Sequence, residues 1–197
     1  MADAERLDRR AALQRLLRDR GDAALVTGLG SPTYDACAAG DTASNFYLWG
    51  AMGGAAMLGL GVALAQPQRR VVVWTGDGEM LMGLGSLATI AVARPANLAI
   101  VVVDNEHYGE TGMQAAHTGR GVDLAAIARG AGIEDARTVR TAAELEALAQ
   151  RLFSAPGPLF ACVKVGTQPV PHTVPSLDGP YLRTRFRQAM AGPGAFG

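Results

Sequence analysis

The chain has 197 residues, 49% of them hydrophobic, which is enough for one substantial domain and too few for two large ones. Its 18 Lys and Arg balance its 18 Asp and Glu, so the charge gives no sign of a nucleic-acid partner. Cys37 and Cys162 form no C-x-x-C motif or disulfide framework, and the charged N-terminus lacks the apolar core of a signal peptide, so we expect a cytoplasmic protein.

The predicted elements alternate between helix and strand. In chain order we expect a helix over about 4–18, a strand and turn over 24–30, a helix over 50–65, a strand over 70–75, a helix over 79–93, a strand over 98–104, a polar loop over 105–121, helices near 122–130 and 142–153, and a strand over 158–165. The strands are continuous apolar runs, as in strands covered on both faces. The pattern predicts an α/β fold with an open parallel sheet flanked by helices on both faces.

One uncharged stretch, 42–68, invites comparison with a membrane-spanning helix. Asn45 lies near its start, five glycines interrupt it and Pro67 lies near its end. We therefore expect a helix packed closely on a sheet or partner, and no membrane span.

The domain organisation follows from these elements. Residues 1–24 are interpreted as an N-terminal helix, 25–165 as the main domain and 166–197 as a proline-rich C-terminal arm. Within the arm we expect an extended chain with one helix near 181–190.

Three loops leave the carboxyl ends of the predicted strands, where open parallel sheets bind ligands: 27–33, 76–79 and 105–112. The dinucleotide fingerprint fails in each loop, and the Walker A motif is absent. Gly76-Asp77-Gly78 instead places a carboxylate in a tight turn, where it would repel a bound phosphate unless a cation lay between them.

A second polar residue, Asn105, completes the predicted cation site. Asn105 follows Asp77 by 28 residues, and the segment between them has the content of one helix-and-strand crossover. Adjacent parallel strands would bring both oxygen donors to one edge of the sheet, where they suit a Mg²⁺ ion that completes its shell with water and phosphate. The helix that begins near Glu79 would add its N-terminal N–H groups.

This motif resembles the diphosphate-binding motif of thiamine diphosphate enzymes, in which GDG is followed by 26 residues and Asn. The resemblance extends over about Leu25 to Ile133, where the sequence resembles the phosphonopyruvate and sulfopyruvate decarboxylases. The matching segments are Asn45-Phe46-Tyr47, Gly50-Ala51-Met52-Gly53, GDGEMLMGLGSLATIA from Gly76, Asn97-Leu98 and Gly112-Met113-Gln114.

The resemblance implies the cofactors thiamine diphosphate and Mg²⁺ and a PP-type, diphosphate-binding domain. Asp77, Asn105 and the backbone carbonyl of His107 would bind Mg²⁺, and Gly78 and Glu79 would donate backbone N–H groups to the diphosphate. The cofactor would act as the electron sink when a small 2-oxo acid loses CO₂.

Further roles follow from the same resemblance. The carbonyl of Gly50 would accept from the aminopyrimidine ring, and Met52 would wedge between the two rings of the cofactor. Glu110 lies near the place of a catalytic side chain in related decarboxylases, although its register is off by one. The remaining cofactor-binding candidates are Ser31, Gly76, Tyr108 and Gly109.

Each candidate also has a plainer interpretation. Asp77 alone would be a turn or helix-capping carboxylate, and only its pairing with Asn105 argues otherwise. Met52 alone would be a core methionine, and His107 and His117 would be solvated loop histidines. Arg120 could meet a sulfonate or phosphonate, but a lone loop arginine is more often solvated.

The resemblance also implies a catalytic glutamate that none of the predicted elements supplies. In this family a glutamate from a separate pyrimidine-binding domain activates the cofactor, and that domain needs about 150 residues. We therefore expect that the chain alone is inactive and that a pyrimidine-domain partner subunit supplies the glutamate. We also expect self-association as a dimer.

The substrate and reaction stay open at this point. A 2-oxoacid decarboxylase subunit is favoured, with an acetolactate synthase-like carboligase subunit or a non-catalytic thiamine diphosphate-binding protein as alternatives. A pyruvate:ferredoxin-type subunit is weaker, because two scattered cysteines cannot ligate a cluster.

Overall fold

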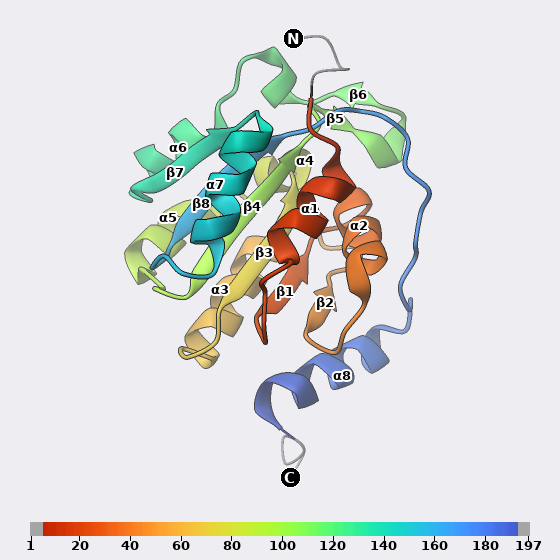
Figure 1. Cartoon of the computed structure of the whole chain (residues 1–197), viewed down its shortest axis with the longest axis vertical. Coiled ribbons are helices and arrows are strands. Elements are labelled where there is room, and N and C mark those ends of the chain that lie inside the picture. Colours follow the sequence, from red (N-terminus) through yellow and green to blue (C-terminus); the bar gives the residue numbers. More distant parts are fainter. Residues whose placement is uncertain (1–5, 193–197) are drawn as a thin grey trace.

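A computed structural model describes residues 6–192 of the chain. These residues build a six-stranded sheet in the order β2-β1-β3-β4-β8-β7, and every neighbouring pair is parallel. The predicted parallel sheet is therefore confirmed (Figure 1). Its strands are β1 (Ala24–Thr27), β2 (Asn45–Tyr47), β3 (Val71–Gly76), β4 (Leu98–Asp104), β7 (Asp135–Val139) and β8 (Leu159–Lys164).

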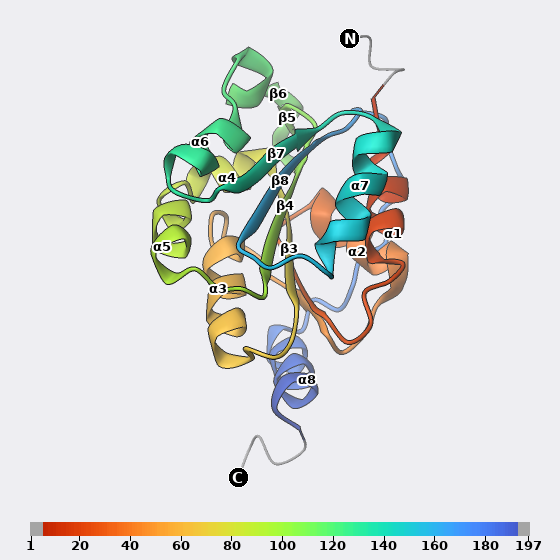
Figure 2. The same ribbon diagram turned by 60° about the vertical axis from the view of Figure 1, so that its left-hand side comes forward.

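Helices cover both faces of the sheet, as the apolar strands predict (Figure 2). Two apolar clusters result, one on each side of the sheet, because β4 and its neighbours are buried on both faces. One face carries α1 (Arg9–Leu17), α2 (Ser31–Gly40) and α7 (Ala142–Leu152); the other carries α3 (Ala55–Ala65), α4 (Asp77–Met82), α5 (Gly85–Ala93) and α6 (Leu124–Gly130).

Two predicted helices differ from the observed ones in a way that shapes the site. The helix predicted over 50–65 begins only at Ala55, because Gly50 and Gly53 have φ of 71° and 88° and belong to a loop. The helix predicted over 79–93 is two helices, α4 and α5, separated at Gly83. A Cβ on Gly83 would lie 2.3 Å from the carbonyl oxygen of Gly53, so the break lets the loop pack against α4.

Several short elements are absent from the sequence prediction. Helix α2 begins inside the loop predicted over 27–33 and continues through 34–40, where no element is predicted, although Pro32 suits a first helical turn. Strand β2 is not predicted because it has only three residues, and β7 is not predicted because it mixes charged with apolar side chains. The loop predicted over 105–121 contains a small hairpin of β5 (His107–Tyr108) and β6 (Gln114–Ala115) and two 3-10 turns, Gly109–Thr111 and His117–Arg120.

The two ends of the described chain pack on the domain. Helix α1 begins at Arg9, later than predicted, because the Asp8 side chain caps it by accepting from the N–H of Ala11 at 2.7 Å; the first two residues of the predicted helix, 4 and 5, lie outside the described residues. The predicted C-terminal helix is α8 (Gly179–Ala191), which packs against β2. No helix in the described range is long and apolar enough to cross a bilayer.

Candidate active site

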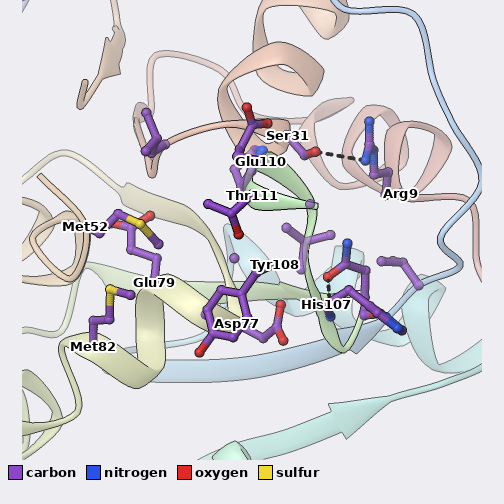
Figure 3. Close-up of a pocket in the computed structure, with 18 residues that line it drawn as sticks. Arg9, Ser31, Met52, Asp77, Glu79, Met82, His107, Tyr108, Glu110 and Thr111 are labelled. Atoms are coloured by element: carbon purple, nitrogen blue, oxygen red, sulfur yellow. Dashed lines mark hydrogen bonds between the residues drawn. The ribbon is translucent and has the colours of Figure 1, made fainter. Parts of the chain in front are cut away.

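A cavity of about 250 Å³ opens beside the carboxyl ends of β1, β3 and β4 (Figure 3). Strands β3 and β4 are neighbours with Gly76 opposite Val103, so the residues that follow them emerge together. The lining residues are Arg9, Leu29, Ser31, Pro32, Met52, Gly76, Asp77, Gly78, Glu79, Met82, Val103, Asn105, His107, Tyr108, Gly109, Glu110, Thr111 and Val165.

Two buried carboxylates share one hydroxyl at the floor of this site. The Thr118 hydroxyl lies 2.9 Å from Asp77 Oδ2 and 2.9 Å from Asp104 Oδ1, yet it has a single proton to donate. Burial, followed by repulsion from Asp104, raises the pKa of Asp77. Two carboxylates this close form a site that favours a cation beside Asp77.

One cation already neutralises Asp104. Lys164, the only lysine in the sequence, places Nζ 2.7 Å from Asp104 Oδ2 and 2.8 Å from Glu106 Oε1. Burial alone would lower the pKa of Lys164, but its bonds to these two carboxylates outweigh burial and raise it. Asp104 is therefore paired within the protein, whereas Asp77 faces the cavity without an ion pair among the described residues.

Asn105 and His107 form a tight turn at the cavity wall. Asn105 Oδ1 accepts from the His107 N–H at 3.0 Å, and His107 Nδ1 lies 2.9 Å from the Asn105 carbonyl oxygen. Among residues 6–192 no three His, Cys, Asp or Glu side chains form a metal-binding group by themselves. A metal beside Asp77 would therefore depend on amide, carbonyl and ligand oxygens, which is the donor set that suits Mg²⁺.

Glu79 turns its side chain inward and connects two loops to strand β3. Its carboxylate accepts from Thr75 Oγ1 at 2.8 Å and from the Ala55 N–H at 3.2 Å, and the N–H groups of Leu29 and Gly53 also stabilise its charge. Burial raises the pKa of Glu79, and these hydrogen bonds partly offset that effect. The carboxylate thus fixes the loops after β1 and before α3 to the start of α4.

Close packing requires glycine at the GDG turn. A Cβ on Gly78 would lie 2.4 Å from Cε1 of Tyr108, so the tyrosine ring lies directly over the backbone of this turn. Met52 and Met82 line the side of the cavity away from Arg9 (Figure 3) and are 42% and 59% exposed. Met52 is therefore a wall residue here and does not fill the core.

Most of the candidate residues lie together. All of the predicted site residues line the cavity except Gly50, which is exposed two residues before Met52. His117 and Arg120 are exposed and do not line it. Arg9, Thr118 and the Lys164 ion pair were not anticipated from the sequence, because each reaches the site from a distant segment.

The fold and this site together define a class of enzyme domain. Residues 30–163 match the family described as thiamine pyrophosphate enzyme, C-terminal TPP binding domain, and the chain belongs to that family. A thiamin diphosphate-dependent enzyme structure from Mycobacterium smegmatis has a TM-score of 0.70 and 26% identity over 82% of this chain and 32% of its own.

Individual relatives within this family are decarboxylases and decarboxylase subunits. The sulfopyruvate decarboxylase subunit beta of Methanothermobacter thermautotrophicus is 37% identical over 94% of this chain and 97% of its own length. The Methanocaldococcus jannaschii subunit beta is 42% identical over 58% of this chain and 60% of its own. Phosphonopyruvate decarboxylase of Streptomyces viridochromogenes is 43% identical over 77% of this chain, but this chain spans only 37% of that protein.

Proposed function

We propose that this chain is the diphosphate- and Mg²⁺-binding subunit of a two-subunit, thiamine diphosphate-dependent 2-oxoacid decarboxylase. The observation that carries the proposal is the arrangement of Asp77 and Asn105 at the ends of neighbouring strands, on the wall of one cavity. The similarity to a sulfopyruvate decarboxylase subunit over nearly its full length supports the same assignment.

The described residues suit the cofactor's anionic end. In this proposal Asp77, Asn105 and the His107 carbonyl bind Mg²⁺, and the glycine turn at Gly76 and Gly78 admits the diphosphate close to the backbone. A side chain at position 78 would collide with the Tyr108 ring, so glycine at this position lets the ring pack on the turn. Thr118 positions Asp77 through its hydroxyl.

The other end of the cavity is assigned to the rings. When bound, the cofactor supplies an electron sink for decarboxylation of a 2-oxo acid. From the loop before α3, Met52 would support the rings and the Gly50 carbonyl would accept from the aminopyrimidine. Glu110 also lines the cavity, on the side of Ser31 (Figure 3), where it would act on the substrate. Ser31, Glu79, Tyr108 and Gly109 complete the cofactor-binding wall.

The activating glutamate is assigned to a partner. Glu79 does not fill that role, because its carboxylate is buried and already bonded to two loops and to strand β3. A pyrimidine-domain subunit would dock over the open side, where Met52 and Met82 are exposed. We also propose self-association through α3, whose Met57 and Leu64 are 42% and 59% exposed.

Sulfopyruvate and phosphonopyruvate are the first substrates to test, because the relatives named above act on them. An acetolactate synthase-like carboligase is the second candidate, favoured by a 29% identical acetolactate synthase large subunit from Escherichia coli. We place the protein in the cytoplasm, which agrees with free thiols at Cys37 and Cys162.

Release of CO₂ tests the proposal. The isolated chain, saturated with thiamine diphosphate and Mg²⁺, should not turn over either 2-oxo acid, and adding a pyrimidine-domain subunit should restore turnover. Robust activity of the isolated chain would place the activating carboxylate within these residues and refute the division of labour. Acetolactate formation from pyruvate by the complex, without release of an aldehyde, would favour the carboligase.

A further inference from the structure

Arg9 belongs to the first turn of α1, yet its side chain lines the cavity. Leu7 forms a parallel bridge with Val165, just beyond β8, and the Gly166 N–H donates to the Leu7 carbonyl at 3.0 Å. Val165 itself lines the cavity. This pairing brings the start of α1 to the carboxyl edge of the sheet and explains why a residue so early in the chain reaches the site.

Helix α2 holds the Arg9 guanidinium in place. Arg9 Nη1 donates to Ser31 Oγ at 2.9 Å (Figure 3). Its Nε lies 2.9 Å from Oδ2 of Asp35, which is fully buried. Ser31 and Asp35 are one turn apart on α2 and therefore face α1 together. With only 10% of its side chain exposed, Arg9 is fixed at the cavity wall beside the Ser31 hydroxyl.

The position of Arg9 matters because most of the charged side chains that line the cavity are acidic. Three carboxylates line the cavity: Asp77, Glu79 and Glu110. Among the lining side chains that the structure describes, Arg9 alone carries a guanidinium or ammonium group. A diphosphate with a single Mg²⁺ would keep excess negative charge in this acidic cavity, and a preorganised guanidinium is well suited to bind a phosphate oxygen.

We propose that Arg9, together with the Ser31 hydroxyl, binds the terminal phosphate of the cofactor's diphosphate, on the side of the cavity away from Met52. This inference rests on the proposed cofactor site and adds an anion-binding residue from α1. Figure 3 shows Arg9 and Ser31 on one side of the cavity and Met52 with Met82 on the other, so Arg9 faces the proposed diphosphate end and not the ring end.

A matched pair of arginines makes the test specific. Arg10 also pairs with Asp35, at 3.2 Å from Nε to Oδ1, but it does not line the cavity. Calorimetry with the full chain would measure the affinity for Mg²⁺-pyrophosphate and for Mg²⁺-thiamine diphosphate. Arg9→Gln should weaken both by about tenfold or more, because a charged hydrogen bond is lost, whereas Arg10→Gln should leave both near wild type.

The outcomes separate this inference from the proposed function. If wild type binds pyrophosphate and both Arg9→Gln and Arg10→Gln bind it with the same affinity, the role of Arg9 is overturned and the proposed cofactor site is not. Unchanged pyrophosphate affinity in Arg9→Gln, with a raised KM for the 2-oxo acid in the partner complex, would assign Arg9 to the substrate anion and also overturn it. Absence of Mg²⁺-pyrophosphate binding by wild type, both alone and in the partner complex, would overturn both proposals.

A second variant covers loss of folding. Arg9→Lys keeps a positive charge beside Asp35 but cannot make the same forked contacts, so it should fold and bind pyrophosphate with intermediate affinity. Thermal unfolding without ligand identifies any variant whose α1 no longer packs on α2. Wild-type affinity in a folded Arg9→Lys and in a folded Arg9→Gln would refute the assignment.

Discussion

Gly28→Ala should reveal how strongly the buried Glu79 carboxylate holds the cavity together. A Cβ at position 28 would lie 1.5 Å from Glu79 Oε2, 2.5 Å from its Cδ and 2.8 Å from Thr75 Oγ1. The backbone conformation of Gly28 needs no positive φ, so the only penalty is space. The methyl group must therefore displace a carboxylate that is 4% exposed and bonded to Thr75 and Ala55.

The cost combines two effects. Overpacking a filled interior destabilises by about 1–3 kcal/mol, and loss of a hydrogen bond to a buried charge costs about 1.5–3 kcal/mol. We expect the free energy of unfolding to fall by about 3 kcal/mol or more. Binding of Mg²⁺-thiamine diphosphate should weaken as well, because Glu79 connects the loops that carry Leu29 and Met52.

Urea unfolding would measure the loss, with Gly130→Ala as the control. Gly130 lies exposed at the end of α6, and a Cβ added there would have no atom within 4 Å, so that change should alter the free energy of unfolding by no more than about 0.5 kcal/mol. In a Glu79→Ala background the Gly28 substitution should cost much less, because the main clash is gone. Equal costs in both backgrounds would refute the proposed contact.

Three further predictions concern the metal, the cofactor rings and pH. Asp77→Ala should abolish Mg²⁺-dependent binding of thiamine diphosphate in calorimetry of the partner complex, and unchanged affinity would rule out the metal site. Met52→Ala should leave pyrophosphate binding intact but slow turnover, since it acts on ring geometry; near wild-type turnover in a folded variant would argue against that role. Burial would raise the pKa of Asp41, but its hydrogen bonds from Arg185 and Tyr47 outweigh burial and lower that pKa. The stability that Asp41 contributes is therefore present above the ordinary pKa of 3.8 and is lost as pH falls through the lowered pKa. Urea unfolding from about pH 6 towards about pH 2 should therefore show a steeper loss below about pH 4 in wild type than in Arg185→Gln, and parallel curves would contradict the sign.

The sequence was most informative where one physical cause acts locally. Continuous apolar runs such as Leu98–Val103 predict strands buried on both faces, and the strand predicted over 98–104 is observed with the same bounds. The convergence of Asp77 and Asn105 followed from the spacing of adjacent parallel strands. Both inferences need only periodicity and the direction of the sheet.

Contacts between distant segments could not be predicted in the same way. Thr118 joins Asp77 across 41 residues, and Glu79 reaches Ala55 across 24. Neither pairing leaves a periodic signal, because each depends on how separate loops fold back. Helix α2 escapes prediction for a different reason: its small residues and its Gly30 cap, which makes no side-chain hydrogen bond, give it a weak helical pattern.

Helix α8 has a consequence for aggregation. It packs against β2, at one border of the sheet, with Leu182 in one apolar cluster and Phe186 in the other, and Arg185 bonded to Asp41. A foreign strand could extend the sheet there only after displacing this helix. Loss of the ion pair between Arg185 and Asp41 should therefore expose the edge of β2 to pairing with strands of other molecules. A weakened C-terminal helix would be detected first as aggregation.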